Sequence, residues 1–69
     1  MDNYSALSAR EKEVLCWLIE GKSNEDIGAI LDISPHTVKN HVQNLFKKLN
    51  VSNRQHAVAV ALNTGNTEL

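Results

Sequence analysis

Apolar residues recur along this chain at the three-to-four-residue spacing of amphipathic helices, with short polar or glycine-containing stretches between the periodic segments. The first segment follows a capping box, in which Glu11 can accept a hydrogen bond from the amide of Ser8. Gly21 predicts its end, so a first helix is expected up to about Glu20. The apolar face of this helix consists of Val14, Leu15, Leu18 and Ile19.

A second, shorter helix is expected after Ser23, whose hydroxyl suits the N-cap position. Gly28 lies in its middle, where glycine costs roughly 1 kcal/mol of helix propensity but lets another backbone approach closely. The apolar positions of this helix share one side, and they are Ile27, Ile30 and Leu31.

The longest periodic segment predicts a third helix, which follows a turn over residues 32–34. Ser34 suits the N-cap, and Pro35 suits the first helical position because the amide proton that it lacks has no partner there. We expect this helix to continue to Leu49. Asn50 stands where glycine often follows a helix, and asparagine tolerates the left-handed conformation that the position requires.

The last apolar segment, AVAVAL at 57–62, can be read as a strand or as a helix. A lone strand would have no partner in this chain, and alanine favours helix, so we predict a helix over about 53–64. Ser52 and Gln55 have the spacing of a second capping box at its start, and Gly65 indicates its end.

Together the segments predict an all-α fold, with four helices in a single domain over 1–69 and a structured core at about 7–65. A domain of 69 residues buries only about 60% of its unfolded surface, so a second copy or a ligand would help to stabilise it. The single Cys16 cannot form an internal disulfide, and no signal peptide or membrane span is recognisable. These features indicate a cytoplasmic protein.

The charge is unevenly distributed. A formal net charge of −1 and a pI near 6.2 disfavour nucleic-acid binding when taken alone. Residues 1–33, however, carry seven acidic and three basic side chains, whereas residues 34–69 carry one acidic and four basic side chains and all three histidines. The second half therefore has a net charge of +3 and can attract an anionic partner.

The third helix has two different sides, because successive residues turn by about 100° around its axis. One side is an apolar stripe of Val38, Val42, Leu45 and Leu49. The opposite side and its flanks carry amides, imidazoles, lysines and a hydroxyl, namely His36, Thr37, Lys39, Asn40, His41, Gln43, Asn44, Lys47 and Lys48. No carboxylate occurs between Ser34 and Thr67, so this side would not repel phosphates.

Two helices joined by a tight turn, with a small residue in the first and a polar outer side on the second, match the helix-turn-helix arrangement. The second helix of this motif enters the major groove of DNA, and the first crosses the backbone. Asn and Gln can pair with adenine through two hydrogen bonds, and Lys can donate to guanine. We therefore expect binding to double-stranded DNA, against the alternative that the polar side is simply solvated.

The runs LSAREKEVL, GKSNEDIGAIL and ISPHTVKNHVQNLFKKLNVSNR also resemble the DNA-binding domain of the LuxR/FixJ family of bacterial transcriptional regulators. The resemblance implies a four-helix domain of the winged-helix-like superfamily without a wing, whose last helix mediates dimerisation. Gly28 stands where the family usually has Ala, and Asn50 where it usually has Gly; both swaps are expected to preserve the fold. A nucleoid location when bound and RNA polymerase as a further candidate partner follow from the same resemblance, with no cofactor and no membrane.

Motif alignment with that family implies which residues touch DNA. Base contacts are expected from Lys39, Asn40 and Gln43. Backbone contacts are expected from Ser23, Thr37, His41, Lys47 and Arg54, and we add Lys22, Asn24, Ser34, His36 and Asn44 as further backbone candidates.

Several of these side chains have a second interpretation. His41 borders the apolar stripe and fits a partly buried imidazole as well as a phosphate donor. His36 and His56 favour plain surface positions, and the five-residue spacing of His36 and His41 disfavours a metal site. Cys16 has no recognisable general base nearby, which favours a small core thiol over a nucleophile.

The last helix is apolar on all sides, which requires burial against more than one neighbour. We assign Val58 and Leu62 to a partner surface, and Ala57 and Ala61 to close packing on the first or third helix. A symmetric homodimer, weak in solution and favoured on a pseudo-palindromic DNA site, is the expected result. A protein-interaction adaptor is the alternative function, and an enzyme is disfavoured because no phosphate loop, ligand cluster or triad is recognisable.

Overall fold

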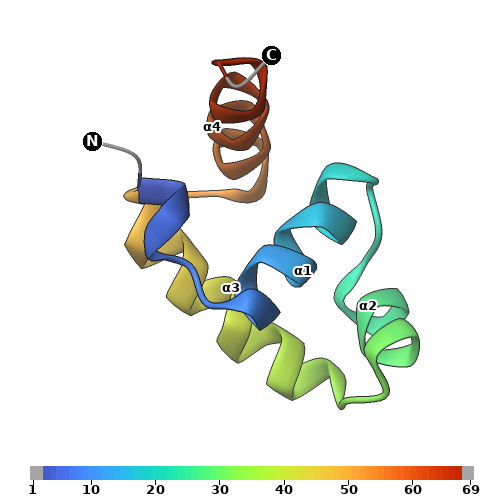
Figure 1. Cartoon of the computed structure of the whole chain (residues 1–69). Helices are drawn as coiled ribbons and strands as arrows, with labels where there is room; N and C mark the ends of the chain where they lie inside the picture. Colours follow the sequence, from blue (N-terminus) through green and yellow to red (C-terminus); the bar gives the residue numbers. More distant parts are fainter. Residues whose placement is uncertain (1–2, 68–69) are drawn as a thin grey trace.

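Four α-helices and a short 3-10 helix form the part of the chain that this computed structural model describes, residues 3–67, with side chains described for 5–63. No strand occurs within that part, which confirms the all-α prediction and the helical reading of AVAVAL. The elements are η1 (Asn3–Ala6), α1 (Ala9–Ile19), α2 (Asn24–Leu31), α3 (Pro35–Leu49) and α4 (Arg54–Thr67) (Figure 1).

Side-chain caps set the starts of the first three helices where the sequence predicts them. At α1 the amide N–H of Glu11 donates to Ser8 Oγ at 3.1 Å, and Ser8 N–H donates to Glu11 Oε1 at 2.8 Å. A second reciprocal box, between Ser23 and Asp26, opens α2. Ser34 caps α3 ahead of Pro35, as expected.

The start of α4 differs from the prediction by one residue. The side-chain oxygen of Asn53 accepts from the amide N–H of His56 at 2.8 Å, and the Asn53 carbonyl oxygen accepts from Ala57 N–H at 3.0 Å. Asn53 is therefore the cap, and the predicted box between Ser52 and Gln55 is wrong. The helix also continues to Thr67, two residues past the Gly65 at which it was expected to end.

Three helices end in the same way, with one residue in the left-handed region. These residues are Gly21 (φ 85°), Asp32 (φ 60°) and Asn50 (φ 59°). After each of them the next amide N–H donates to a carbonyl five residues earlier, as in Val51 to Phe46 at 3.0 Å and Ile33 to Gly28 at 2.9 Å. This is the Schellman pattern, and it explains how Asn50 fills a position that usually holds glycine.

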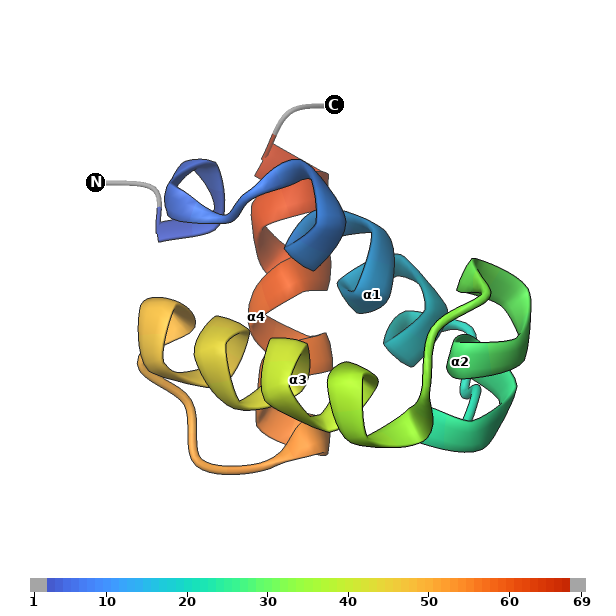
Figure 2. The same cartoon turned by 90° about the horizontal axis from the view of Figure 1, so that it is seen from below.

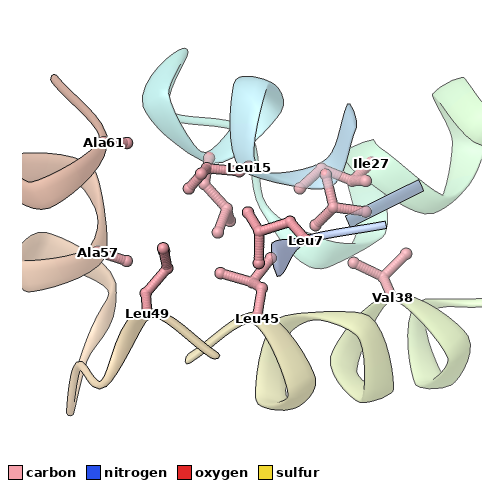
Figure 3. Close-up of a cluster of buried hydrophobic side chains, with 10 residues drawn as sticks. Leu7, Leu15, Ile27, Val38, Leu45, Leu49, Ala57 and Ala61 are labelled. Carbon is pink, nitrogen blue, oxygen red and sulfur yellow. The ribbon is translucent and has the colours of Figure 1, made fainter. Parts of the chain in front are cut away.

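The core lies between α1 and α3, with α2 at one end of the pair and α4 crossing behind it in the view of Figure 2. In Figure 3 the side chains of Leu45 and Leu49 point from α3 toward Leu15 of α1, while Ala57 and Ala61 of α4 approach from the side. The fully or nearly buried apolar residues are Leu7, Val14, Leu15, Leu18, Ile27, Val38, Leu45, Leu49, Ala57 and Ala61.

Two predicted core positions are corrected. Ile30 is 45% exposed, because α2 turns Ile27 and Gly28, rather than Ile30, toward its neighbours. Cys16 is exposed, so the interpretation as a core thiol is wrong; it lies on α1 three residues after the exposed Glu13, on the same side of the helix. Val42, on the apolar stripe of α3, is half-buried and packs against the core.

No helix within residues 3–67 is both long and apolar enough to cross a membrane.

Candidate nucleic-acid interface

The tight turn between α2 and α3 requires a residue without a side chain at Gly28. Ile33 N–H donates to the carbonyl oxygen of Gly28, and a β-carbon at Gly28 would lie 2.6 Å from the carbonyl oxygen of Ile33. Such a β-carbon would also lie 3.3 Å from the nitrogen of Pro35, at the start of α3. Glycine thus allows α3 to leave the turn directly beside α2. An alanine, the usual residue in the family that the sequence resembles, would require the turn to move.

The outer side of α3 carries the three residues that were predicted to read bases. Lys39, Asn40 and Gln43 are all exposed, and they lie on the side of the helix away from Val38 and Leu45, which are fully buried. The neighbouring polar residues of this side are exposed at His36, Asn44 and Lys47 and half-buried at Thr37 and His41. The structure therefore gathers all eight α3 candidates on one side and its flanks.

Two hydroxyl groups mark the first turn of α3. Ser34 Oγ accepts from the amide N–H of Thr37 at 3.1 Å and lies 2.9 Å from Thr37 Oγ1. One of the two hydroxyl protons is used in that bond between the side chains, and the other is left to donate elsewhere. The pair can therefore offer one O–H donor to a phosphate oxygen while it caps the helix.

The start of α2 supplies the second group of candidates. Lys22 and Ser23 are exposed, and Asn24 is half-buried. Ser23 Oγ accepts from the amide N–H of Asp26 at 3.1 Å. The carboxylates of Glu25 and Asp26 lie in this same first turn, which places negative charge next to the candidates for phosphate contact. A phosphate contact by Lys22 or Ser23 must therefore overcome the repulsion between these two carboxylates and the phosphate.

A partly buried ion pair engages Lys48, one of the lysines on the flank of α3. Lys48 Nζ donates to Glu11 Oε1 at 2.8 Å, and the same oxygen accepts from the Ser8 amide, while Glu11 is only 5% exposed. The Lys48 hydrogen bond and then the Ser8 amide lower the pKa of the Glu11 carboxyl, against the opposing effect of burial. Lys48 thus ties the end of α3 to the start of α1. No local pattern in the sequence indicates this pair, because its members are 37 residues apart.

Arg54 also has a partner within the chain. Its guanidinium Nη2 donates to the main-chain carbonyl oxygen of Lys22, and the side chain is half-buried. This contact joins the first residue of α4 to the segment just before α2.

The two α4 residues that were predicted to contact a partner, Val58 and Leu62, differ in exposure. Ala57 and Ala61 are buried, as expected, against the rest of the domain. Leu62 is 49% exposed, whereas Val58 is half-buried and packs against the core. Of the two residues assigned to a partner, Leu62 is the one that this monomer leaves largely uncovered.

No group of three or more His, Cys, Asp or Glu side chains in the described part of the chain is arranged to hold a metal ion.

Comparison with known proteins supports the helix-turn-helix reading. Residues 5–61 match the family model for bacterial regulatory proteins, luxR family. The chain is 48% identical over 64 residues to the transcriptional activator protein SolR of Ralstonia nicotianae. That alignment covers 93% of this chain and 27% of SolR. It is 45% identical over 58 residues to the transcriptional regulatory protein LiaR of Bacillus subtilis, covering 84% of this chain and 28% of LiaR.

The chain thus spans little more than a quarter of the length of these relatives. The match nevertheless includes α1, α2 and α3 in full and most of α4. The chain therefore belongs to the luxR family of bacterial regulatory proteins, whose helix-turn-helix domains point to DNA binding in transcription regulation.

Proposed function

We propose that this chain binds double-stranded DNA sequence-specifically, with α3 inserted into the major groove. The observation that carries the proposal is the outer side of α3, where exposed amide, imidazole and ammonium groups occur without a carboxylate, opposite a stripe that is buried in the core. A helix with its side chains is about 10–12 Å across, and the major groove is about 12 Å wide, so α3 fits into it.

Lys39, Asn40 and Gln43 are proposed to read base edges. Their side chains are exposed and free of the caps and ion pairs that engage Ser34, Thr37 and Lys48. Amides can pair with adenine through a donor and an acceptor at once, and lysine can donate to guanine. The proposed backbone contacts flank this group, and they are Lys22, Ser23, Asn24, Ser34, His36, Thr37, His41, Asn44 and Lys47.

Dimerisation through α4 is part of the proposal, with the exposed Leu62 as its main apolar contact and Val58 beside it. A patch this small contributes about 25 cal/mol per Å² of apolar area, before the entropic cost of association. We therefore propose a dimer that is weak in solution and forms mainly on two DNA half-sites, in the cytoplasm on the nucleoid. RNA polymerase is the further partner proposed for the DNA-bound protein.

Selection of bound duplexes from a random pool tests binding, specificity and half-site symmetry together. We expect an enriched sequence, and an affinity that falls as salt rises because lysines release counterions from phosphates. On the enriched duplex, Asn40→Ala or Gln43→Ala should cost about 1 to 3 kcal/mol and flatten the preference at particular bases.

The matched control is Lys47→Ala, which should weaken binding to all sequences alike and lower the salt slope by about one. If the pool yields no enriched duplex and binding shows no salt dependence, the helix-turn-helix serves a protein partner instead. If Asn40→Ala and Gln43→Ala bind as tightly and selectively as the parent, α3 does not read bases through them.

A further inference from the structure

Within the described part of the chain, Arg54 is one of two basic residues of the second half that have a partner within the domain, the other being Lys48 with Glu11. Lys39 and Lys47 extend from α3 with exposed side chains, whereas Arg54 is half-buried and its guanidinium donates to the carbonyl oxygen of Lys22, 32 residues earlier. This bond uses one of the guanidinium N–H groups. The structure therefore gives Arg54 a contact within the chain, in addition to the phosphate contact that motif alignment implies.

The acceptor of this bond, the carbonyl oxygen of Lys22, lies in the connection between α1 and α2. Lys22 N–H donates to Trp17 O at 3.0 Å and so completes the end of α1, and the next residue, Ser23, caps α2. Lys22 is thus fixed through its N–H by α1 and through its carbonyl by Arg54. The connection between α1 and α2 covers residues 20–23. The main-chain N–H groups of Glu20, Gly21 and Lys22 donate back to α1, and Ser23 belongs to the capping box of α2.

The donor side is equally well fixed. Arg54 is the first residue of α4, and Asn53 caps that helix through His56 N–H at 2.8 Å. Ala57, one turn later, is fully buried in the core, so the start of α4 cannot move independently of the domain. The guanidinium therefore connects a fixed helix start to the carbonyl oxygen of Lys22, in the connection between α1 and α2.

We propose that Arg54 is a positioning residue: it holds the segment Lys22–Asn24, at the start of α2, in the orientation that lets this segment contact a DNA phosphate. This inference rests on the proposed DNA binding. The phosphate is bound by Lys22 and Asn24, and Arg54 acts through them.

A double-mutant cycle on the selected duplex separates positioning from direct contact. Arg54→Met keeps the length of the apolar stem and removes every donor, and Lys22→Met removes the ammonium of the segment that Arg54 holds. We expect Arg54→Met to lower affinity roughly tenfold and Lys22→Met by a similar factor. In the Arg54→Met background, Lys22→Met should change affinity less than about twofold and leave the salt slope unchanged, because the contact is already lost.

Two independent phosphate contacts would give the opposite result, with multiplied affinity losses and a salt slope lowered by about two in the double variant. That result would overturn the proposal. Lys47→Met is the matched control, since Lys47 lies on α3 and has no link to Lys22; its loss should multiply with that of Arg54→Met.

Arg54→Lys provides a variant that keeps the positive charge. A phosphate accepts an ammonium as a point charge, so a direct contact would leave binding nearly unchanged. Positioning requires the planar guanidinium at the Lys22 carbonyl, so we expect at least a fivefold loss for Arg54→Lys. If Arg54→Met does not fold, Arg54→Lys takes its place in the cycle, with the same criteria.

A measurement without DNA separates failure of this inference from failure of the proposed function. Amide hydrogen exchange at Lys22, whose N–H donates to Trp17 O, should be several-fold faster in Arg54→Lys than in the parent, with exchange at Leu45 unchanged. Equal exchange at Lys22 in both proteins would overturn the positioning role even if DNA binding is confirmed. If exchange is faster in Arg54→Lys but the parent binds no duplex, Arg54 only stabilises the connection between α1 and α2. That result would overturn its role in phosphate binding.

Discussion

α3 and α4 have nearly the same length and opposite designs. α3 buries Val38, Leu45 and Leu49 on one side and exposes polar groups on the other, so its two roles are assigned to two sides. α4 packs through small residues, Ala57 and Ala61, and leaves the larger Leu62 half uncovered. Side-chain polarity thus distinguishes the buried side of α3 from its exposed side, whereas on α4 side-chain size does so.

The largest expected effect tests that separation on α3. Leu45→Ala should lower the free energy of unfolding by about 2 to 5 kcal/mol, because Leu45 is fully buried and its loss opens a cavity in a small core. Asn40→Ala, on the exposed side of the same helix, should change it by less than about 0.5 kcal/mol. Urea denaturation of both variants measures the contrast; equal losses would mean that α3 is buried all round and could not enter a groove.

The next largest effect distinguishes Val58 from Leu62, the two α4 residues that were assigned to a partner surface. Val58→Asp should lower the free energy of unfolding by roughly 1 to 3 kcal/mol, since it places a carboxylate against the core that Val58 contacts. Leu62→Asp should leave the monomer folded and abolish cooperative occupation of a duplex with two half-sites. Binding to a single half-site should change only through the added negative charge.

Ala59→Asp is the matched control, because Ala59 is exposed on α4 and gains the same charge. Cooperativity that survives Leu62→Asp as well as it survives Ala59→Asp would remove Leu62 from the dimer contact. An unfolded Leu62→Asp protein would show that Leu62 belongs to the core instead.

Local spacing accounts for most of what the sequence predicts about this fold. Ser8 with Glu11, Ser34 with Pro35, and Asn50 each act within one helical turn, so their roles follow from positions a few residues apart. The start of α4 was misplaced by one residue because Ser52 and Asn53 can both cap a helix. AVAVAL has no one-sided periodicity that would choose between them.

Long-range side-chain contacts are what the sequence could not supply. Helical angles placed Lys39, Asn40 and Gln43 on the outer side of α3, but nothing in the spacing joins Lys48 to Glu11 or Arg54 to Lys22. Those pairs depend on how α1, α3 and α4 pack, and this packing cannot be read from the residue spacing of one sequence. Motif resemblance assigns Arg54 to a phosphate and says nothing of its bond to Lys22, because an alignment carries positions and not contacts.

The smallest effect concerns Lys48, the one lysine on the polar flank of α3 that serves the fold. Its bond to Glu11 lowers the pKa of that carboxyl below the ordinary value of 4.5, so the folded state binds the proton less readily than the unfolded state. The stabilisation is therefore complete above about pH 4.5 and is lost as the pH falls through the lowered pKa of the folded protein.

Replacing Lys48 removes one partner of this pair. Because its side chain is 40% exposed, we expect Lys48→Met to cost only about 1 kcal/mol at pH 7, and this difference from the parent should shrink as the pH falls through the lowered pKa of the Glu11 carboxyl. Lys47→Met, one residue away and exposed, should show no such pH-dependent difference. Urea midpoints at pH 7 and along an acid pH series measure both variants. A Lys48→Met deficit that persisted unchanged along the whole acid series would mean that the methylene stem, rather than the charge, joins α3 to α1.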